Sequence, residues 1–344
     1  MEQQDILSMT LPELQAAVQE LGEPKFRAKQ IFNWLHQKRV TDFSEMTTLS
    51  LPFRERLASD FCINRLKIAK RLASSVDDTV KYLYELPDGN YVETVCMQYH
   101  HGTSLCISTQ VGCRMGCRFC ASAIAGFVRN LTPAEMLLQI YETERAQNCK
   151  ISSLVLMGIG EPLDNFDNVL RFLQLLSDPN GYGMSLRHVT VSTCGVVPKI
   201  LELAEQRLGL TLSVSLHCPN DAGRSAIMPI NRSYPIDVLL DACQTYFEKT
   251  GRRVTFEYAV MDQVNSAEQD AAALAERLKG LHAHVNLIPI NPVKERNFHT
   301  LKKTVLQFQK TLERYGIPAT IRRTLGSDIE AACGQLRRDA IQQM

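Results

Sequence analysis

The sequence predicts an α/β protein in which a partial (βα)6-type barrel follows a small helical domain. From Ser104 onward, apolar β-type runs alternate with helical runs, and such repeated units call for a parallel sheet. About six or seven units can be traced, so an incomplete barrel fits better than the full eight. The 344 residues exceed the ~250–300 at which a single core stops growing, which leaves room for a second, smaller domain.

The N-terminal residues carry the pattern of short amphipathic helices. The segment from Thr10 to Glu13, TLPE, has the capping-box form with Pro at an early helical position, and apolar side chains follow at helical spacing as far as Leu21. A second such pattern runs from Ala28 to Leu35. We therefore expect a helical accessory domain over residues 1–62.

After this helical part the sequence pattern changes to strand-like runs. TVKYLYEL and YVETVCMQY flank Pro87-Asp88-Gly89-Asn90, which is a turn signal. We expect a β-ribbon linker or extension over residues 63–98 and the barrel over residues 99–344.

The barrel elements are predicted from β-branched runs and from helix starts at Pro or a capping residue. In chain order they are LCIST, a helix at Thr132, SSLVLMG, a helix from Asn165, RHVTVST, a helix near Pro198, LTLSVSL, a helix after Pro235, RRVTFEYAV, a helix from Ser266, AHVNLIPI, a helix near Thr300, and PATIRRT. Side chains at the carboxyl ends of such strands form the active face. The candidates are GIGEP, VSTCG, SLHCPN and IPINP.

Composition excludes some classes of protein. Lys and Arg number 38 against 37 for Asp and Glu, so any contact with nucleic acid has to be local. No apolar run reaches the ~18–20 residues of a membrane span, and the start MEQQDILSM lacks the basic residues of a signal peptide. We expect a cytoplasmic protein with no membrane contact, whose 11 cysteines serve as ligands, redox thiols or packing residues.

Three cysteines, Cys113, Cys117 and Cys120, stand at C-x3-C-x2-C spacing with no fourth nearby. Structural zinc usually takes four protein ligands, and no partner pair appears later in the chain. Buried packing cysteines are a further reading, although Arg114 and Arg118 lie within the motif. Three thiolates suit a [4Fe-4S] cluster that keeps one iron free for a substrate, which is the interpretation we favour.

This spacing is the signature of the radical SAM superfamily, and further segments resemble the RlmN/Cfr family of radical SAM RNA methyltransferases. The resemblance rests on SLCISTQVGCRMGCRFCASAIAGFVRNL, LVLMGIGEPLDN, HVTVSTCGVVPKI, SVSLHCPND, RSAIMPINRSYP, HVNLIPINP and DIEAACGQLR. It implies a radical SAM barrel whose open iron binds S-adenosylmethionine. It also implies that the S-adenosylmethionine pocket is lined by Gly160, Glu161, Ser192, Ser215, Leu216, His217 and Asn291.

The resemblance further implies methylation of carbon 2 of an adenine. That carbon is electrophilic, so simple transfer of the electrophilic methyl of S-adenosylmethionine is blocked, whereas a cysteine thiolate accepts it readily. Cys333 matches the methyl-carrying residue, and a second S-adenosylmethionine provides the radical that joins this methyl to the base. Cys106 matches the cysteine that resolves the protein–RNA adduct by forming a disulfide. Glu93 matches the family's proposed proton acceptor, with a thiol as the alternative for that step.

The implied substrates are an adenosine of 23S rRNA near the peptidyl transferase centre, with tRNA anticodon loops as a further candidate. Residues 51–71 have a local excess of positive charge, which would attract phosphate, although a solvated face has the same composition. We expect a flavodoxin- or ferredoxin-type reductant and a monomer. A Cfr-type carbon 8 methyltransferase and a non-catalytic RNA-binding protein with structural metal are the alternatives.

Overall fold

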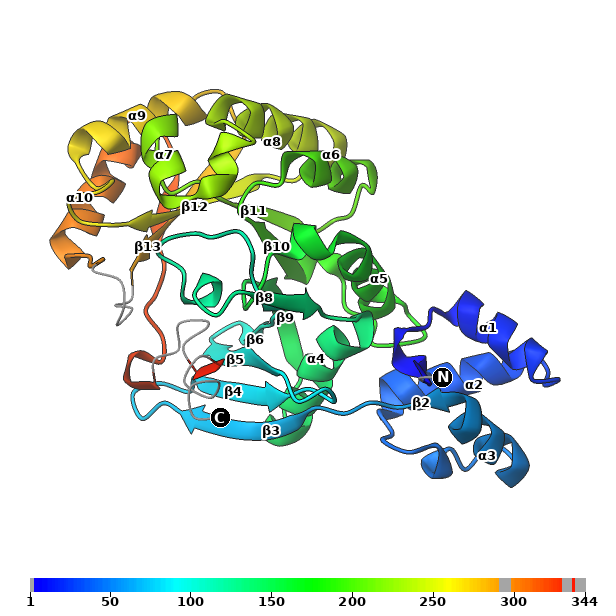
Figure 1. The fold of residues 1–344 in the computed structure, drawn as a ribbon. Coiled ribbons are helices and arrows are strands. Elements are labelled where there is room, and N and C mark those ends of the chain that lie inside the picture. Colours follow the sequence, from blue (N-terminus) through cyan, green and yellow to red (C-terminus); the bar gives the residue numbers. More distant parts are fainter. Residues whose placement is uncertain (1–2, 291–297, 330–335, 338–344) are drawn as a thin grey trace.

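The computed structural model describes residues 3–290, 298–329 and 336–337 (Figure 1). A helical N-terminal part is joined to an α/β part built around one large sheet. The N-terminal elements are β1 (Gln4–Asp5), η1 (Ile6–Ser8), α1 (Leu11–Glu20), α2 (Phe26–Asn33), the π-helical turn η2 (Trp34–Lys38), η3 (Phe43–Glu45), α3 (Leu51–Asp60) and β2 (Phe61–Cys62). The helical region expected before residue 62 is therefore present.

The sheet has ten strands in the order β14-β13-β12-β11-β10-β9-β6-β5-β4-β3. Its strands are β3 (Lys67–Ala73), β4 (Val80–Glu85), β5 (Tyr91–Tyr99), β6 (Gly102–Cys106), β9 (Ile151–Leu156), β10 (Val189–Thr193), β11 (Thr211–Ser215), β12 (Val254–Val260), β13 (Ala283–Pro289) and β14 (Ala319–Ile321). From β6 to β14 every pairing is parallel, whereas β3, β4, β5 and β6 pair antiparallel. The predicted partial barrel is confirmed.

Helices connect the parallel strands, as the βα alternation predicts. They are α4 (Pro133–Gln147), α5 (Phe166–Ser177), α6 (Val197–Glu205), α7 (Asp221–Ile227), α8 (Ile236–Thr250), α9 (Glu268–Leu278) and α10 (Lys302–Arg314). Helix α4 begins with the expected cap, because the Thr132 hydroxyl accepts a bond from the Glu135 amide and the Glu135 carboxylate accepts one from the Thr132 amide. Short 3-10 turns also occur: η4 (Ala121–Ala123), η5 (Pro162–Asn165), η6 (Leu186–His188), η7 (Pro229–Arg232) and η8 (Ser327–Ile329).

Two features were not specified by the sequence. Strands β3 to β5 belong to the barrel sheet itself, so the segment 63–98 extends the barrel wall. A separate hairpin of β7 (Gln110–Gly112) and β8 (Phe127–Asn130) brackets the three-cysteine motif.

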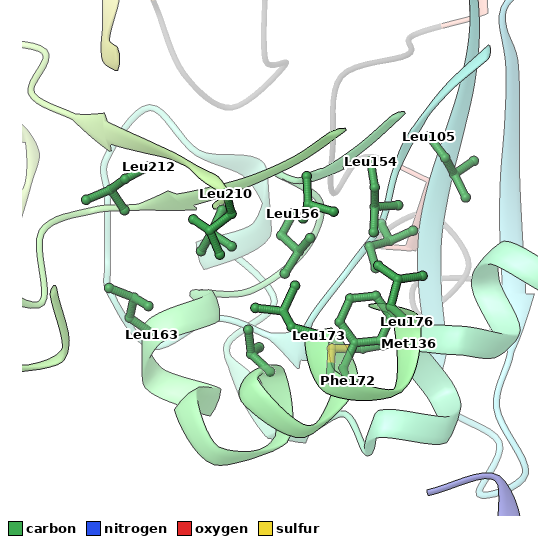
Figure 2. Packing of buried hydrophobic residues seen from close by; sticks show 14 of the residues in the cluster. Leu105, Met136, Leu154, Leu156, Leu163, Phe172, Leu173, Leu176, Leu210 and Leu212 are labelled. Carbon is green, nitrogen blue, oxygen red and sulfur yellow. The ribbon is translucent and has the colours of Figure 1, made fainter. Parts of the chain in front are cut away.

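The main core lies between the parallel sheet and its covering helices. Figure 2 shows leucines of β6 and β9 packed against side chains of α4 and α5. These side chains are buried: Leu105, Leu154, Leu156, Met136, Phe172, Leu173 and Leu176. This packing holds the strands in register and so fixes where their carboxyl ends lie.

The helical N-terminal part packs against α4 and α5 (Figure 1). His36 Nδ1 lies 2.9 Å from the Tyr141 hydroxyl in a fully buried contact. Arg171 of α5 also donates to Glu13 of α1 at 2.7 Å. The two parts therefore share one continuous hydrophobic core. Among the described residues, no helix is long and apolar enough to cross a membrane.

Candidate active site

A cavity of about 280 Å³ lies at the carboxyl ends of the barrel strands. Its lining combines the three-cysteine motif with residues that follow successive strands. The predicted site residues that it brings together are Cys113, Cys117, Cys120, Gly160, Glu161, Ser192, Ser215 and His217. Leu216 is not among the lining residues, because its side chain is buried in the main core. Asn291 and Cys333 lie outside the described residues.

The β7–β8 hairpin shapes the loop that carries the cysteines. Gly112 has a φ of +80°, and a Cβ at this position would lie 1.7 Å from the carbonyl oxygen of Gly126. Only glycine allows the two strands to approach this closely. The Cys113 amide then donates to the Gly126 carbonyl at 3.1 Å, which closes the base of the loop.

The three thiols lie close enough to influence one another electrostatically. Burial raises the pKa of the Cys113 thiol to about 12 and also raises the pKa of Cys117. Iron binds thiolates, so loading of this site releases protons. Among the described residues no three His, Cys, Asp or Glu side chains are placed to hold a single metal ion. A cubane cluster has a different requirement, because each thiolate binds a different iron, and the donor set of three cysteines fits it.

Glu161 is a buried carboxylate that faces the cavity from the loop after β9. Its side chain accepts hydrogen bonds from the amides of Cys194 at 2.7 Å and Leu163 at 3.0 Å. Burial raises its pKa, while these amide donors oppose that rise. Gly160, with a φ of +112°, lies against Gln110, whose side chain in turn accepts the Glu161 amide at 2.8 Å. The arrangement places a buried carboxyl group, held by two amide donors, where a cationic ligand in the cavity would pair with it.

His217 is a neutral donor in the cavity wall. Burial and the nearby Arg224 guanidinium lower its pKa to about 3. Its Nδ1 accepts the Ala259 amide at 2.9 Å, so the ring proton resides on Nε2. The ring packs edge-to-face against Phe119 of the cysteine loop, with centroids 4.7 Å apart. His217 therefore links the cluster loop to the end of β11.

Arg224 of α7 was not singled out by the sequence, because its role depends on how the fold places four acceptors around its side chain. The side chain is fully buried and donates to the carbonyls of Cys194 (2.7 Å), Ser215 (3.0 Å) and Leu216 (3.2 Å) and to the Asn231 amide oxygen (2.9 Å). Three of these acceptors lie at the ends of β10 and β11. One guanidinium thus holds together the two strand ends that bear Ser192 and Ser215.

Glu257 was also missed, although it lies within the FEYAV segment of β12. Its buried carboxylate lines the cavity and accepts from Ser213 at 2.7 Å and Asn286 at 2.9 Å. Burial raises its pKa. The available signal was a polar residue within a strand, because alternate side chains of a barrel strand point to the barrel interior.

Cys106 and Glu93 lie on one face of the sheet beside the cavity. Cys106 ends β6 and pairs in register with Val95, two residues from Glu93 on β5. Cys106 packs with Val95 and Met97, and Met157, which lines the cavity, joins the same cluster. The predicted resolving thiol is therefore adjacent to the cavity wall.

Basic residues away from the cavity lie on β3, on α3 and in a cleft. The exposed edge strand β3 carries Lys67, Lys70 and Arg71, whereas Arg54 and Arg56 lie on α3. A second cleft between η2 and the end of α4 is lined by basic side chains and two glutamates: Lys38, Arg39, Arg65, Arg145, Lys150, Glu45 and Glu144. The basic residues of 51–71 are thus divided among α3, β3 and, through Arg65, the cleft.

Known proteins resemble the chain over almost all of its length. The family model described as the ribosomal RNA large subunit methyltransferase N-terminal domain matches residues 4–63, and the radical SAM superfamily model matches residues 107–275. A probable dual-specificity RNA methyltransferase RlmN of Lachnoclostridium phytofermentans is 51% identical over 97% of this chain and 94% of its own. A protein with the same description in Alkaliphilus oremlandii is 50% identical over 99% of this chain and 100% of its own length. The crystal structure of a radical SAM methyltransferase from Sphaerobacter thermophilus is 40% identical, with a TM-score of 0.92 over 96% of this chain and 98% of that chain.

Proposed function

The chain belongs to the RlmN family of radical SAM RNA methyltransferases, and on that basis we propose that it methylates carbon 2 of an adenosine in 23S rRNA and of an adenosine in tRNA. The observation that carries the proposal is the convergence of three cysteines, Glu161 and His217 on one cavity at the carboxyl ends of the barrel strands. Two molecules of S-adenosylmethionine are used per turnover. One supplies the methyl group and the other supplies the radical.

Different residues of the cavity would bind the cluster and S-adenosylmethionine. Cys113, Cys117 and Cys120 would hold the [4Fe-4S] cluster, since each provides one thiolate from the loop closed by the β7–β8 hairpin. When bound, the cluster and S-adenosylmethionine supply a methyl group, which is transferred to a cysteine sulfur, and a radical, which removes a hydrogen atom from that methyl group. Glu161 would pair with the ammonium of the methionine moiety, because it is a buried carboxylate held by two amides.

The remaining steps fall to side chains on the neighbouring sheet face and the C-terminal segment. Cys333 would carry the methyl group and become joined to the adenine through it. Cys106 would then attack the sulfur of Cys333, so that the disulfide forms as the bond between this sulfur and the methylene carbon breaks. The methylene carbon keeps the electron pair and takes up a proton, which gives the methylated base. Glu93 would accept the carbon 2 proton, which its place on the same face as Cys106 supports.

RNA binding has two candidate surfaces besides the cavity mouth. We propose that the basic cleft between η2 and α4 and the exposed strand β3 contact the phosphate backbone, since both carry cations at the surface. The target adenine has to be unstacked to enter the cavity. We further propose a monomer that works in the cytoplasm with a flavodoxin- or ferredoxin-type electron donor.

Replacement of Cys106 by alanine tests the covalent mechanism. With Cys106→Ala, the adduct between Cys333 and RNA cannot be resolved, so we expect a protein–RNA conjugate that survives denaturation and is seen by gel shift and mass spectrometry. Cys62→Ala, in the N-terminal part, is the matched control and should release methylated RNA normally. A Cys106→Ala enzyme that turns over freely would contradict the resolving role.

The product distinguishes the two branches of the family. We expect 2-methyladenosine in nucleoside digests of rRNA and tRNA treated with the reconstituted enzyme, measured by mass spectrometry. Detection of 8-methyladenosine alone would reassign the chain to the Cfr-type reaction. A protein that binds RNA but shows no iron–sulfur signal by electron paramagnetic resonance would support the non-catalytic alternative.

A further inference from the structure

Glu257 of β12 is a buried carboxylate in the cavity wall to which the proposed chemistry gives no role. Its side chain is 4% exposed and faces the cavity. Its hydrogen-bond donors, Ser213 and Asn286, are neutral, and among the described residues no cation forms an ion pair with it. A buried carboxylate with only neutral partners is costly for folding. Such a group in a cavity is therefore a candidate for contact with a ligand.

The carboxylate has capacity for further hydrogen bonds. Oε1 accepts from the Ser213 hydroxyl at 2.7 Å, and Oε2 accepts from the Asn286 side-chain amide at 2.9 Å. An ionised carboxylate has about four lone-pair positions, shared equally by its oxygens. Each oxygen therefore has a position left for a ligand. Two adjacent hydroxyls can donate to both oxygens at once, and acidic side chains bind ribose hydroxyls in this way in dinucleotide-binding folds.

The side chains around Glu257 form a polar region next to an apolar one. Ser215 pairs with Glu257 in the parallel register and lines the cavity. Ala259 lies two residues further along β12, so it shares the face of Glu257, and it pairs with Ile288 of β13. Ala259, Ile288 and Ile290 line the cavity beyond the carboxylate. This combination suits a nucleoside, with the sugar at the polar residues and the flat base against the apolar ones.

The strand order gives the direction in which such a ligand lies. Strands β9, β10, β11, β12 and β13 are successive neighbours in the sheet. Glu161 follows β9, whereas Glu257 is on β12 and Ile288 is on β13. In S-adenosylmethionine the ammonium, the ribose and the adenine follow one another in the same order. The cavity wall therefore matches a cofactor that lies across the strand ends, with its ammonium at Glu161.

We propose that Glu257 binds the 2′ and 3′ hydroxyls of the S-adenosylmethionine ribose and so holds the adenosyl end of the cofactor. Ser213 and Asn286 act as positioning residues, because they fix the carboxylate that accepts these hydroxyls. The inference rests on the proposed function, since it takes S-adenosylmethionine as the ligand of the cavity. The target nucleotide does not fit this role, because the 3′ oxygen of a nucleotide inside an RNA chain is esterified and leaves no free diol.

Binding of S-adenosylhomocysteine to the reconstituted holoenzyme measures this contact without turnover. This ligand keeps the amino acid, ribose and adenine but has no methyl group to transfer. Its 2′,3′-dideoxy analogue differs only in the two hydroxyls. Anaerobic isothermal titration without RNA gives the affinity of each ligand for the wild type and for Glu257→Gln, and the four values form a thermodynamic cycle.

Glu257→Gln should bind S-adenosylhomocysteine about tenfold more weakly than the wild type does, because a hydrogen bond to a charged acceptor is stronger than one to a neutral amide. The dideoxy analogue should bind the variant no more weakly than the wild type, since it lacks the hydroxyls that Glu257 contacts. Glu268→Gln, which removes a surface ion pair with Arg314, is the control and should match the wild type with both ligands.

Two results of this titration would overturn the proposal. An equal loss of affinity for both ligands in Glu257→Gln would show that Glu257 only supports the cavity wall by joining Ser213 to Asn286. An unchanged affinity for S-adenosylhomocysteine would show that no such contact exists.

Glu257→Asp covers a failure of Glu257→Gln to fold. It keeps the charge but withdraws the carboxylate by about 1.5 Å, the length of one carbon–carbon bond. We expect the same selective loss of affinity for S-adenosylhomocysteine, whereas wild-type affinity in this variant would refute direct contact with the diol. If the wild-type holoenzyme binds neither S-adenosylmethionine nor S-adenosylhomocysteine, the proposed function fails instead.

Discussion

The strongest prediction concerns Arg224, whose buried guanidinium binds four acceptors around the ends of β10 and β11. Lysine keeps the charge but concentrates its donors at one point, so Arg224→Lys should retain about two of the four bonds. Buried hydrogen bonds to a charged group contribute about 1.5 kcal/mol or more each, so the loss of two lowers the free energy of unfolding by about 3 kcal/mol. The carbonyls of Cys194 and Ser215 then lose their common partner, and the cavity wall shifts with them.

Two assays on the same preparation check this reasoning. Urea unfolding followed by circular dichroism gives the change in the free energy of unfolding, and isothermal titration gives the affinity for S-adenosylmethionine. We expect affinity to fall about tenfold, which corresponds to about 1.4 kcal/mol. Arg252→Lys is the control, because Arg252 is half-buried and makes a single 3.3 Å bond to Thr211 at the opposite end of β11. An Arg224→Lys variant within about 1 kcal/mol of this control would refute the assignment.

Two further predictions concern the cysteine loop and the domain contact. Gly112→Ala places a Cβ 1.7 Å from a backbone oxygen, so it should abolish iron–sulfur absorbance after reconstitution, whereas Gly209→Ala, with its nearest neighbour at 3.7 Å, should load normally. Burial lowers the pKa of His36 to about 4, so its stabilising contribution is complete above pH 6.5 and is lost as the pH falls towards 4. Between pH 7 and pH 5 we expect the wild type to lose about 2 kcal/mol more unfolding free energy than His36→Gln, measured by urea titration. Equal losses in the two proteins would contradict a buried neutral histidine, and a cluster in Gly112→Ala would contradict the steric argument.

Elements with strong local signals were predicted well. Capping residues at Thr10 and Thr132 placed helix starts, and β-branched runs placed the parallel strands, because both signals depend on nearby residues. The cysteine spacing predicted a cluster motif, since its three candidate ligands lie within one loop. The strand-end motifs followed from barrel topology, which puts every carboxyl end on one face.

Features that depend on distant residues could not be predicted. Helix α7 has seven residues, too few for a periodic signal, and so the role of Arg224 within it stayed hidden. The basic cleft combines Lys38 with Lys150, whose separation in sequence conceals the patch. The union of the β-ribbon with the barrel sheet depends on the pairing of β5 with β6, and local patterns do not specify which strands pair.

The sheet order has a geometric consequence for the size of the substrate. Strands β3 and β14 form its two edges and do not pair with each other in the described chain, so the wall remains an arc. A closed cylinder admits only molecules that fit its rim. An arc leaves one side unobstructed by strands, which suits a nucleotide that stays covalently attached to a polymer far larger than the protein.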